Sequence, residues 1–123
     1  MLSRSVVLAA SLASALFACA PRDRAWEHVA EVLRAETGDA AAPKVSFQRD
    51  STHLSIHLQA AAFAGMPDSV FESKARGWAK LALRTYERGA MLDSITVSAG
   101  DDVAPNVLFR VVRSYSYAVA SLR

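Results

Sequence analysis

Hydrophobic and polar residues follow two different periods along the chain, and the difference predicts helices and strands separately. Apolar residues recur every three or four positions over residues 24–37 and 67–88, the spacing of a helix with one buried face. They alternate at every second position, as in strands with one buried face, over residues 44–50, 53–60, 94–99 and 107–119. The predicted order of elements is therefore α-β-β-α-β-β.

Both expected helices have recognisable ends and a buried stripe. Asp23 suits the N-cap of the first helix and Gly38 its stop, while Pro67 suits the first turn of the second helix. Gly77 interrupts the second helix, and close approach of that helix to a sheet would explain it. The expected buried stripes consist of Trp26, Val29, Ala30 and Leu33 in the first helix and Phe71, Ala75, Trp78, Leu81, Ala82 and Tyr86 in the second.

The alternating segments predict two hairpins. A short polar link joins 44–50 to 53–60, and a loop over 100–106, containing Asp101 and Asp102, joins the last two strands. In the last strand we expect Phe109, Val111, Tyr115 and Tyr117 to share one face, interrupted by Arg113. Alternation with one polar face is typical of antiparallel sheets. We therefore expect an α+β two-layer sandwich, with a four-stranded antiparallel sheet and two helices on one face.

The N-terminus carries the most specific motif of the chain. Arg4 precedes an uncharged apolar run, which closes as Leu16-Phe17-Ala18-Cys19. This ending resembles the lipobox of bacterial lipoproteins. The resemblance implies cleavage before Cys19, diacylglycerol on its sulfur and acylation of the new amino terminus. It divides the chain into a signal peptide at 1–18, a lipidated tether at 19–22 and one α+β domain at 23–123. The pattern of that domain also resembles several small bacterial lipoproteins of uncharacterised function, without the motif of one family.

Two other interpretations of the N-terminus remain open. A transmembrane anchor would need about 20 apolar residues, and this run is shorter and contains Ser11 and Ser14. An ordinary secretory signal fits the small residues around Cys19 but would place the cut before Pro21. If the source has two membranes, Ala20 in place of a retaining aspartate implies, by the same resemblance, the periplasmic side of the outer membrane.

Composition bounds what the mature chain can do. Removal of residues 1–18 leaves 105 residues, which suits a single domain. Thirteen basic and twelve acidic side chains remain, so net charge gives no indication of nucleic acid as a partner. Cys19 is the only cysteine, so no internal disulfide is available and the fold depends on its core.

No pattern in the sequence predicts a catalytic residue, a metal site or a cofactor. The chain lacks a nucleophile elbow and a phosphate-binding glycine loop. His53 and His57 are spaced like helical zinc ligands, but on a strand they would lie roughly 13 Å apart. Asp101 and Asp102 lack the regularly spaced ligands of a calcium loop. We expect solvated histidines and a polar turn.

The second helix has the most ordered surface pattern. Its basic residues are Lys74, Arg76, Lys80, Arg84 and Arg88, four of which recur at every fourth position. That spacing predicts one basic ridge drifting by about 40° per step, with Glu72 able to pair with Arg76 at one end. The ridge is either an ordinary solvated face or a contact for anionic headgroups or an acidic envelope protein.

These observations favour a non-enzymatic binding or accessory module attached to a membrane of the bacterial cell envelope. Two alternatives remain. The first is a small envelope enzyme, which would need a pocket joining His53, His57 or Arg113 to a carboxylate. The second is a module whose sheet edge forms dimers or adds a partner's strand. The sequence leaves the oligomeric state open.

Overall fold

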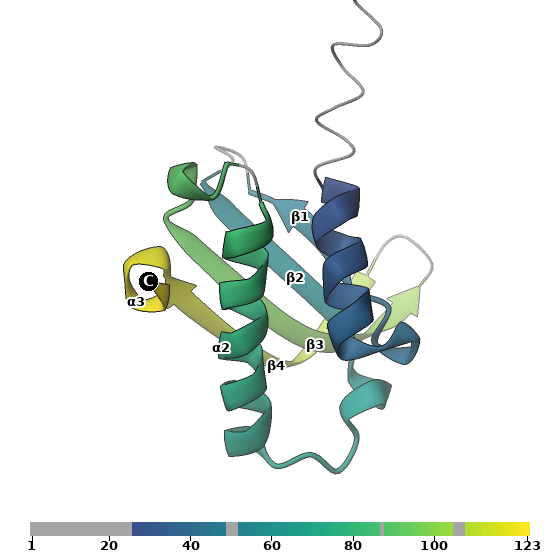
Figure 1. The fold of residues 1–123 in the computed structure, drawn as a ribbon. Helices are drawn as coiled ribbons and strands as arrows, with labels where there is room; N and C mark the ends of the chain where they lie inside the picture. The colour runs from purple at the N-terminus through teal and green to yellow at the C-terminus, as the bar shows by residue number, and fades with distance from the viewer. Residues whose placement is uncertain (1–25, 49–51, 87, 105–107) are drawn as a thin grey trace, which may run out of the picture.

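The computed structural model describes residues 26–48, 52–86, 88–104 and 108–123, which fold into one four-stranded sheet with helices packed on it (Figure 1). The first helix covers residues 26–37. The other elements are β1 (Lys44–Phe47), β2 (His53–Gln59), α2 (Asp68–Thr85), β3 (Ser94–Ala104), β4 (Leu108–Ala118) and α3 (Val119–Leu122). Short 3-10 turns at Asp39–Ala41, Ala60–Phe63 and Gly89–Met91 join them. The predicted α+β class is confirmed, while the signal peptide, the tether and Asp23 lie outside the described residues.

The sheet is mixed, so the prediction of a wholly antiparallel sheet is wrong. Its order is β1-β2-β3-β4, and the two hairpin pairs β1–β2 and β3–β4 are antiparallel as expected. The central pair is parallel, with Leu54 opposite Ile95 and Leu58 opposite Ala99. The 18-residue helix α2 connects β2 to β3 and brings the chain back to the end where β2 began. Parallel neighbours require such a crossover.

Both long helices cover the same face of the sheet, and the core lies between the two layers (Figure 1). The first helix buries Val29 and Leu33, as expected, whereas Trp26 is 42% exposed and rests against Phe47. α2 buries Phe71, Ala75, Trp78, Ala79 and Ala82. β2 and β3 supply fully buried aliphatic side chains from the facing side, namely Leu54, Ile56, Leu58, Ile95 and Val97.

The chain after β2 and after β4 differs from the prediction in detail. α2 ends at Thr85, so Arg88 lies beyond the helix, and Pro67 occupies the N-cap position. β4 ends one residue earlier than expected, because Val119 begins the short helix α3. Gly38 stops the first helix as predicted, with φ of 96° and its N–H donating to the carbonyl of Arg34 at 2.8 Å.

β3 is longer than predicted, and this corrects the expected loop over 100–106. Asp101 and Asp102 are strand residues paired with β4, while residues 105–107 lie outside the described residues. Exposed ion pairs stabilise this end of the sheet: Arg110 reaches Asp101 at 3.3 Å, and Lys44 reaches Asp102 at 3.8 Å. The two aspartates therefore extend the β3–β4 ribbon.

A β-bulge in β4 overturns the expected common face of its aromatic residues. Ala99 pairs with Arg113 but Gly100 pairs with Val111, so β4 holds one extra residue at this point. Because side chains alternate along a strand, the extra residue moves Phe109 and Val111 to the face opposite Tyr115 and Tyr117. Arg113 therefore lies on the helix-covered face, and Phe109 lies on the open face.

Gly100, in β3, and Gly77, in α2, differ in how much space surrounds their Cα atoms. A Cβ at Gly100 would lie 2.2 Å from the carbonyl oxygen of Arg110 and 2.8 Å from the ring of Phe109. A Cβ at Gly77 would meet no heavy atom within 4 Å, so close approach to the sheet does not explain this residue.

Alanine substitutions at these two glycines should therefore change stability in opposite directions. Gly100→Ala should destabilise the fold by about 1–3 kcal/mol, because backbone has to move to accept the methyl group. Gly77→Ala should stabilise it by about 0.5–1 kcal/mol, because alanine is the better helix former and meets no obstacle. Urea unfolding followed by circular dichroism measures both. Equal effects of the two substitutions would contradict the packing described here.

Candidate functional site

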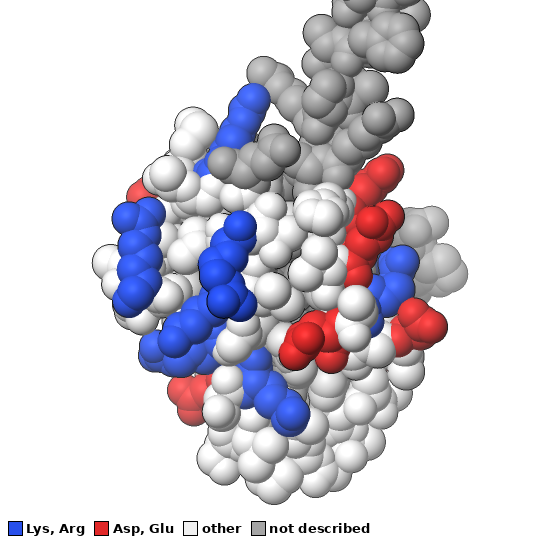
Figure 2. Space-filling view, in the orientation of Figure 1, with Lys and Arg blue, Asp and Glu red and all other residues white. Residues whose placement is uncertain are grey.

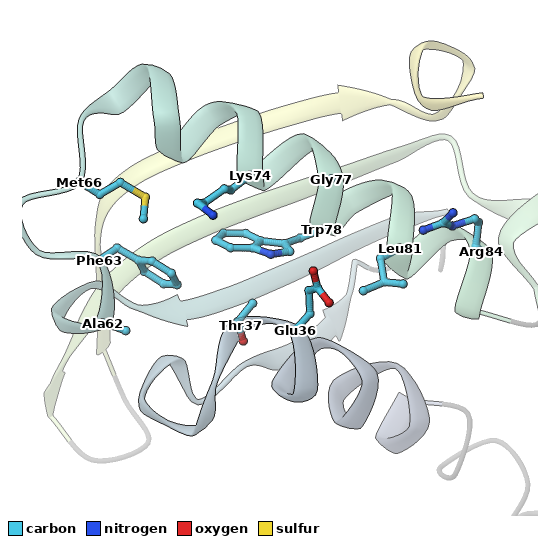
Figure 3. Close-up of a pocket in the computed structure, with 10 residues that line it drawn as sticks. All are labelled: Glu36, Thr37, Ala62, Phe63, Met66, Lys74, Gly77, Trp78, Leu81 and Arg84. Atoms are coloured by element: carbon cyan, nitrogen blue, oxygen red, sulfur yellow. The ribbon is translucent and has the colours of Figure 1, made fainter.

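A groove runs between the first helix and α2 on the helical face of the molecule (Figure 3). Its volume is about 510 Å³. One wall is α2, the other is the end of the first helix, and the 3-10 turn Ala60–Phe63 lies at one end. The lining residues are Glu36, Thr37, Ala62, Phe63, Met66, Lys74, Gly77, Trp78, Leu81 and Arg84.

An aromatic cluster forms the floor of the groove. Trp78 is 7% exposed, and its ring centroid lies 5.3 Å from that of Phe63 and 5.7 Å from that of Phe71. Phe63 and Phe71 also contact each other edge to face at 5.4 Å. Phe63 and Trp78 line the groove, and Phe71 packs beneath them. The floor is therefore a closely packed aromatic surface.

The rim of the groove is charged. Lys74 and Arg84 stand on the α2 wall and Glu36 on the facing wall (Figure 3). All three side chains are exposed. Within the described ranges, the ion pairs join Lys44, Arg110 and Arg113 to aspartates and involve none of the three rim residues. The rim charges are thus available to a partner.

The basic residues predicted as one ridge are all exposed, and four of the five lie on α2. Arg76 lies toward β4, where its guanidinium is 5.2 Å from the ring centre of Tyr117 and donates to the carbonyl of Ser121 at 3.3 Å. No ion pair joins Arg76 to Glu72 in the described structure, contrary to the expected pairing. The Glu72 carbonyl instead accepts a hydrogen bond from Tyr117.

The remaining ridge residues divide between two hollows and a turn. Lys74 lines the groove, whereas Lys80 lines a smaller hollow of about 400 Å³ beside α3, and Arg84 lines both. Arg88 lies in the turn beyond α2. Figure 2 shows the result on the helical face: Lys and Arg gather over α2, Asp and Glu gather mainly over the first helix, and uncharged surface lies between.

Arg113 is the polar residue whose role the sequence did not reveal. Its guanidinium donates to the carbonyls of Met66 at 2.7 Å and Phe63 at 2.9 Å, and lies 4.7 Å from the ring centre of Phe71. It also pairs with Asp68 at 3.4 Å. These contacts hold the turn before α2 against the sheet, so Arg113 supports the groove from beneath and does not line it.

The histidines predicted on the open face of the sheet do lie there, but both are partly buried. His53 hydrogen bonds to Ser94 and, at 2.9 Å, to Thr96. His57 approaches the hydroxyl of Ser46 at 3.5 Å and packs edge to face on Phe109 at 5.0 Å. Among the described residues, no three His, Cys, Asp or Glu side chains gather as metal ligands would.

His57, on the open face of the sheet, has a perturbed pKa. Its Nδ1 is buried without a hydrogen-bond partner in the described structure. Desolvation by burial lowers the pKa of His57, and the nearby positive charge of Lys44 lowers it further. Native His57 therefore resists protonation more than an unfolded histidine does.

The lowered pKa of His57 should make stability fall in weak acid. Above about pH 6.5, the ordinary pKa of histidine, His57 is neutral in both the folded and the unfolded state, so protonation costs no folding stability. As pH falls through 6.5 toward the lowered native pKa, the unfolded chain binds the proton first and stability is lost. Urea midpoints measured between pH 8 and 5 should show this slope. His57→Gln should flatten it, whereas His28→Gln, on the exposed side of the first helix, controls for loss of a histidine. An unchanged slope in His57→Gln would contradict the assignment.

Comparisons with known proteins complete the description of the site. No protein-family model, curated protein or solved structure matches this chain. None of the described helices combines the length and apolarity that crossing a membrane requires.

Proposed function

We propose that this protein is a non-enzymatic binding module, held on a membrane of the bacterial envelope by lipid on Cys19, that engages an acidic surface through its helical face. The observation that carries the proposal is the groove floored by Trp78 and flanked by the exposed, unpaired cations Lys74 and Arg84. An apolar centre with a charged rim is the usual build of a recognition surface. If the source has two membranes, the outer membrane is the expected site.

A binding role fits the groove better than a catalytic one. General acid–base chemistry needs a donor or acceptor held by neighbours near a reacting atom, usually where water is excluded. The groove's charged groups, Glu36, Lys74 and Arg84, are all exposed at its rim. His53, His57 and Arg113, the residues that an enzyme site was expected to use, do not line it.

Edge pairing of β4 is the second candidate and has one supporting observation. Val111 and Val112 are 51% and 56% exposed on this outer strand. However, the bulge between Arg113 and Val111 interrupts the regular backbone spacing that an added strand needs. Arg110 beside the valines adds a charge to the same edge, and such features oppose strand addition.

The anchor can be tested by mass spectrometry. Protein extracted from bacterial membranes should begin at Cys19 and carry the mass of a diacylglycerol and an amide-linked acyl chain. Cys19→Ser should accumulate as uncut precursor, because the thiol is the lipid acceptor. A mature chain beginning at Ala20 or later without lipid would contradict the anchor and favour plain secretion.

The cationic face can be tested without the anchor. Residues 22–123 should bind vesicles containing anionic lipid at low salt and lose binding near physiological salt, because the attraction is long-range and screened. Each basic residue near such a surface contributes about 1 kcal/mol. Replacing Lys74, Lys80 and Arg84 with glutamine should therefore weaken binding at least about tenfold. Lys44→Gln with Arg110→Gln, on β1 and β4 and on neither helix, is the control. Equal binding by the cationic-face variant and wild type would show that these basic residues are ordinary solvated side chains and would contradict the proposed role.

A further inference from the structure

The two helices of the binding face carry opposite charge. α2 has four basic and two acidic residues, whereas residues 26–37 have three acidic and one basic. Figure 2 shows the basic half and the mainly acidic half side by side, with mostly uncharged surface between them. Glu31 and Glu36 on the first helix and Lys74, Lys80 and Arg84 on α2 are exposed, and none forms an ion pair within the described part of the chain. Such a face complements another copy of itself.

Only one two-fold arrangement uses this complementarity. The helices lie roughly antiparallel, since the first begins at the end of the molecule where α2 finishes (Figure 1). A two-fold axis along the groove, parallel to the helices, places α2 of one copy over the first helix of the other and brings basic residues onto acidic ones. An axis across the groove places each helix on its own counterpart, so like charges face each other. Like charges brought together across an interface are unfavourable.

We propose that the acidic surface engaged by the helical face is the first helix of a second copy, giving a face-to-face dimer about an axis along the groove. Arg84 lies near the C-terminal end of α2, which is the end next to the start of the first helix. In the dimer it therefore faces Glu31 of the other copy. Lys74 and Lys80, nearer the other end of α2, face Glu36 of the other copy. The apolar groove floors face each other at the centre. This inference rests on the proposed binding role of the helical face.

The anchor favours the same axis. A rotation about an axis parallel to the helices leaves both first helices starting at the same end of the dimer, so two chains anchored through Cys19 reach one membrane. The alternative axis sends the two starts to opposite ends, which a tether of a few residues from Cys19 to the first helix cannot accommodate. Anchoring in one membrane also raises the local concentration of partners, so a modest interface suffices.

Gly77 gives independent support. It faces the groove in mid-helix, costs roughly 1 kcal/mol relative to alanine, and meets nothing within 4 Å in the single chain. A helix from a second copy approaching this point would use the missing side chain, as small residues do where helices come close. The dimer therefore explains a residue that the monomer does not.

Charge exchange between the two halves tests the proposal on the full-length lipidated protein. Two differently tagged copies are co-expressed, extracted from membranes in mild detergent, and captured through one tag. Wild-type copies should capture each other, and rising salt should weaken capture. Lys74→Glu with Arg84→Glu in both copies should lower capture at least about tenfold, as should Glu31→Lys with Glu36→Lys in both. One copy of each variant should pair again, because the substituted charges of the two copies then face each other with opposite sign.

The restored pair excludes misfolding, since two unfolded variants would not rescue each other. Lys44→Glu with Arg110→Glu, equal in charge change but on β1 and β4 and on neither helix, should leave capture unchanged. Absence of wild-type capture, or failure of the mixed pair to recover, overturns the dimer. If anionic vesicles still bind the protein in that case, the binding role stands and lipid is the partner; if they do not, the binding role fails as well.

Discussion

The architecture depends on the packing of α2 across the parallel pair β2–β3. The helix buries Phe71, Ala75 and Trp78 against fully buried aliphatic residues of both strands, so it provides the crossover and the centre of the core together. A crossover helix lies flat on its sheet because only then is its apolar stripe removed from water. Once α2 is fixed in this way, its remaining face must point outward. The placement of the cations follows from this burial, since they occupy the positions that the core does not use.

A polar contact completes the same packing from the sheet side. Arg113 donates to the carbonyls of Phe63 and Met66, and its planar group lies over the ring of Phe71. A mostly buried arginine is tolerated when its donors are used and a carboxylate is near, and Asp68 supplies that carboxylate. These contacts attach the turn before α2 to β4. The position of the aromatic floor therefore depends on the sheet as well as on the two helices.

Charge is separated on the helical face, and the proposed binding role depends on this separation. Lys74 and Arg84 lie across the groove from Glu36, yet the described side chains do not close into ion pairs across it. Charges of opposite sign held apart on one face create a directional field, which governs how a partner is oriented more than how tightly it is held. The short anchor proposed at Cys19 would restrict orientation further, so the dimer and the membrane would impose compatible geometries.

The sequence by itself determined the two long helices and the approximate course of the four strands, because period and end signals are local. The stripes of Val29 and Leu33 and of Phe71 and Trp78, the stop at Gly38 and the first hairpin were all predictable from neighbours along the chain. Three other features were not predictable from the sequence: the parallel direction of β3 beside β2, the position of Phe109 on the open face, and the contacts of Arg113 beneath the groove. Each depends on contacts between residues far apart in sequence: a crossover that returns over the sheet, one extra residue in a strand pair, and backbone carbonyls 47 and 50 positions away. The exposed cations of α2 were predictable as a pattern, but only the tertiary structure decided which of them line a groove, because that depended on where the first helix lies.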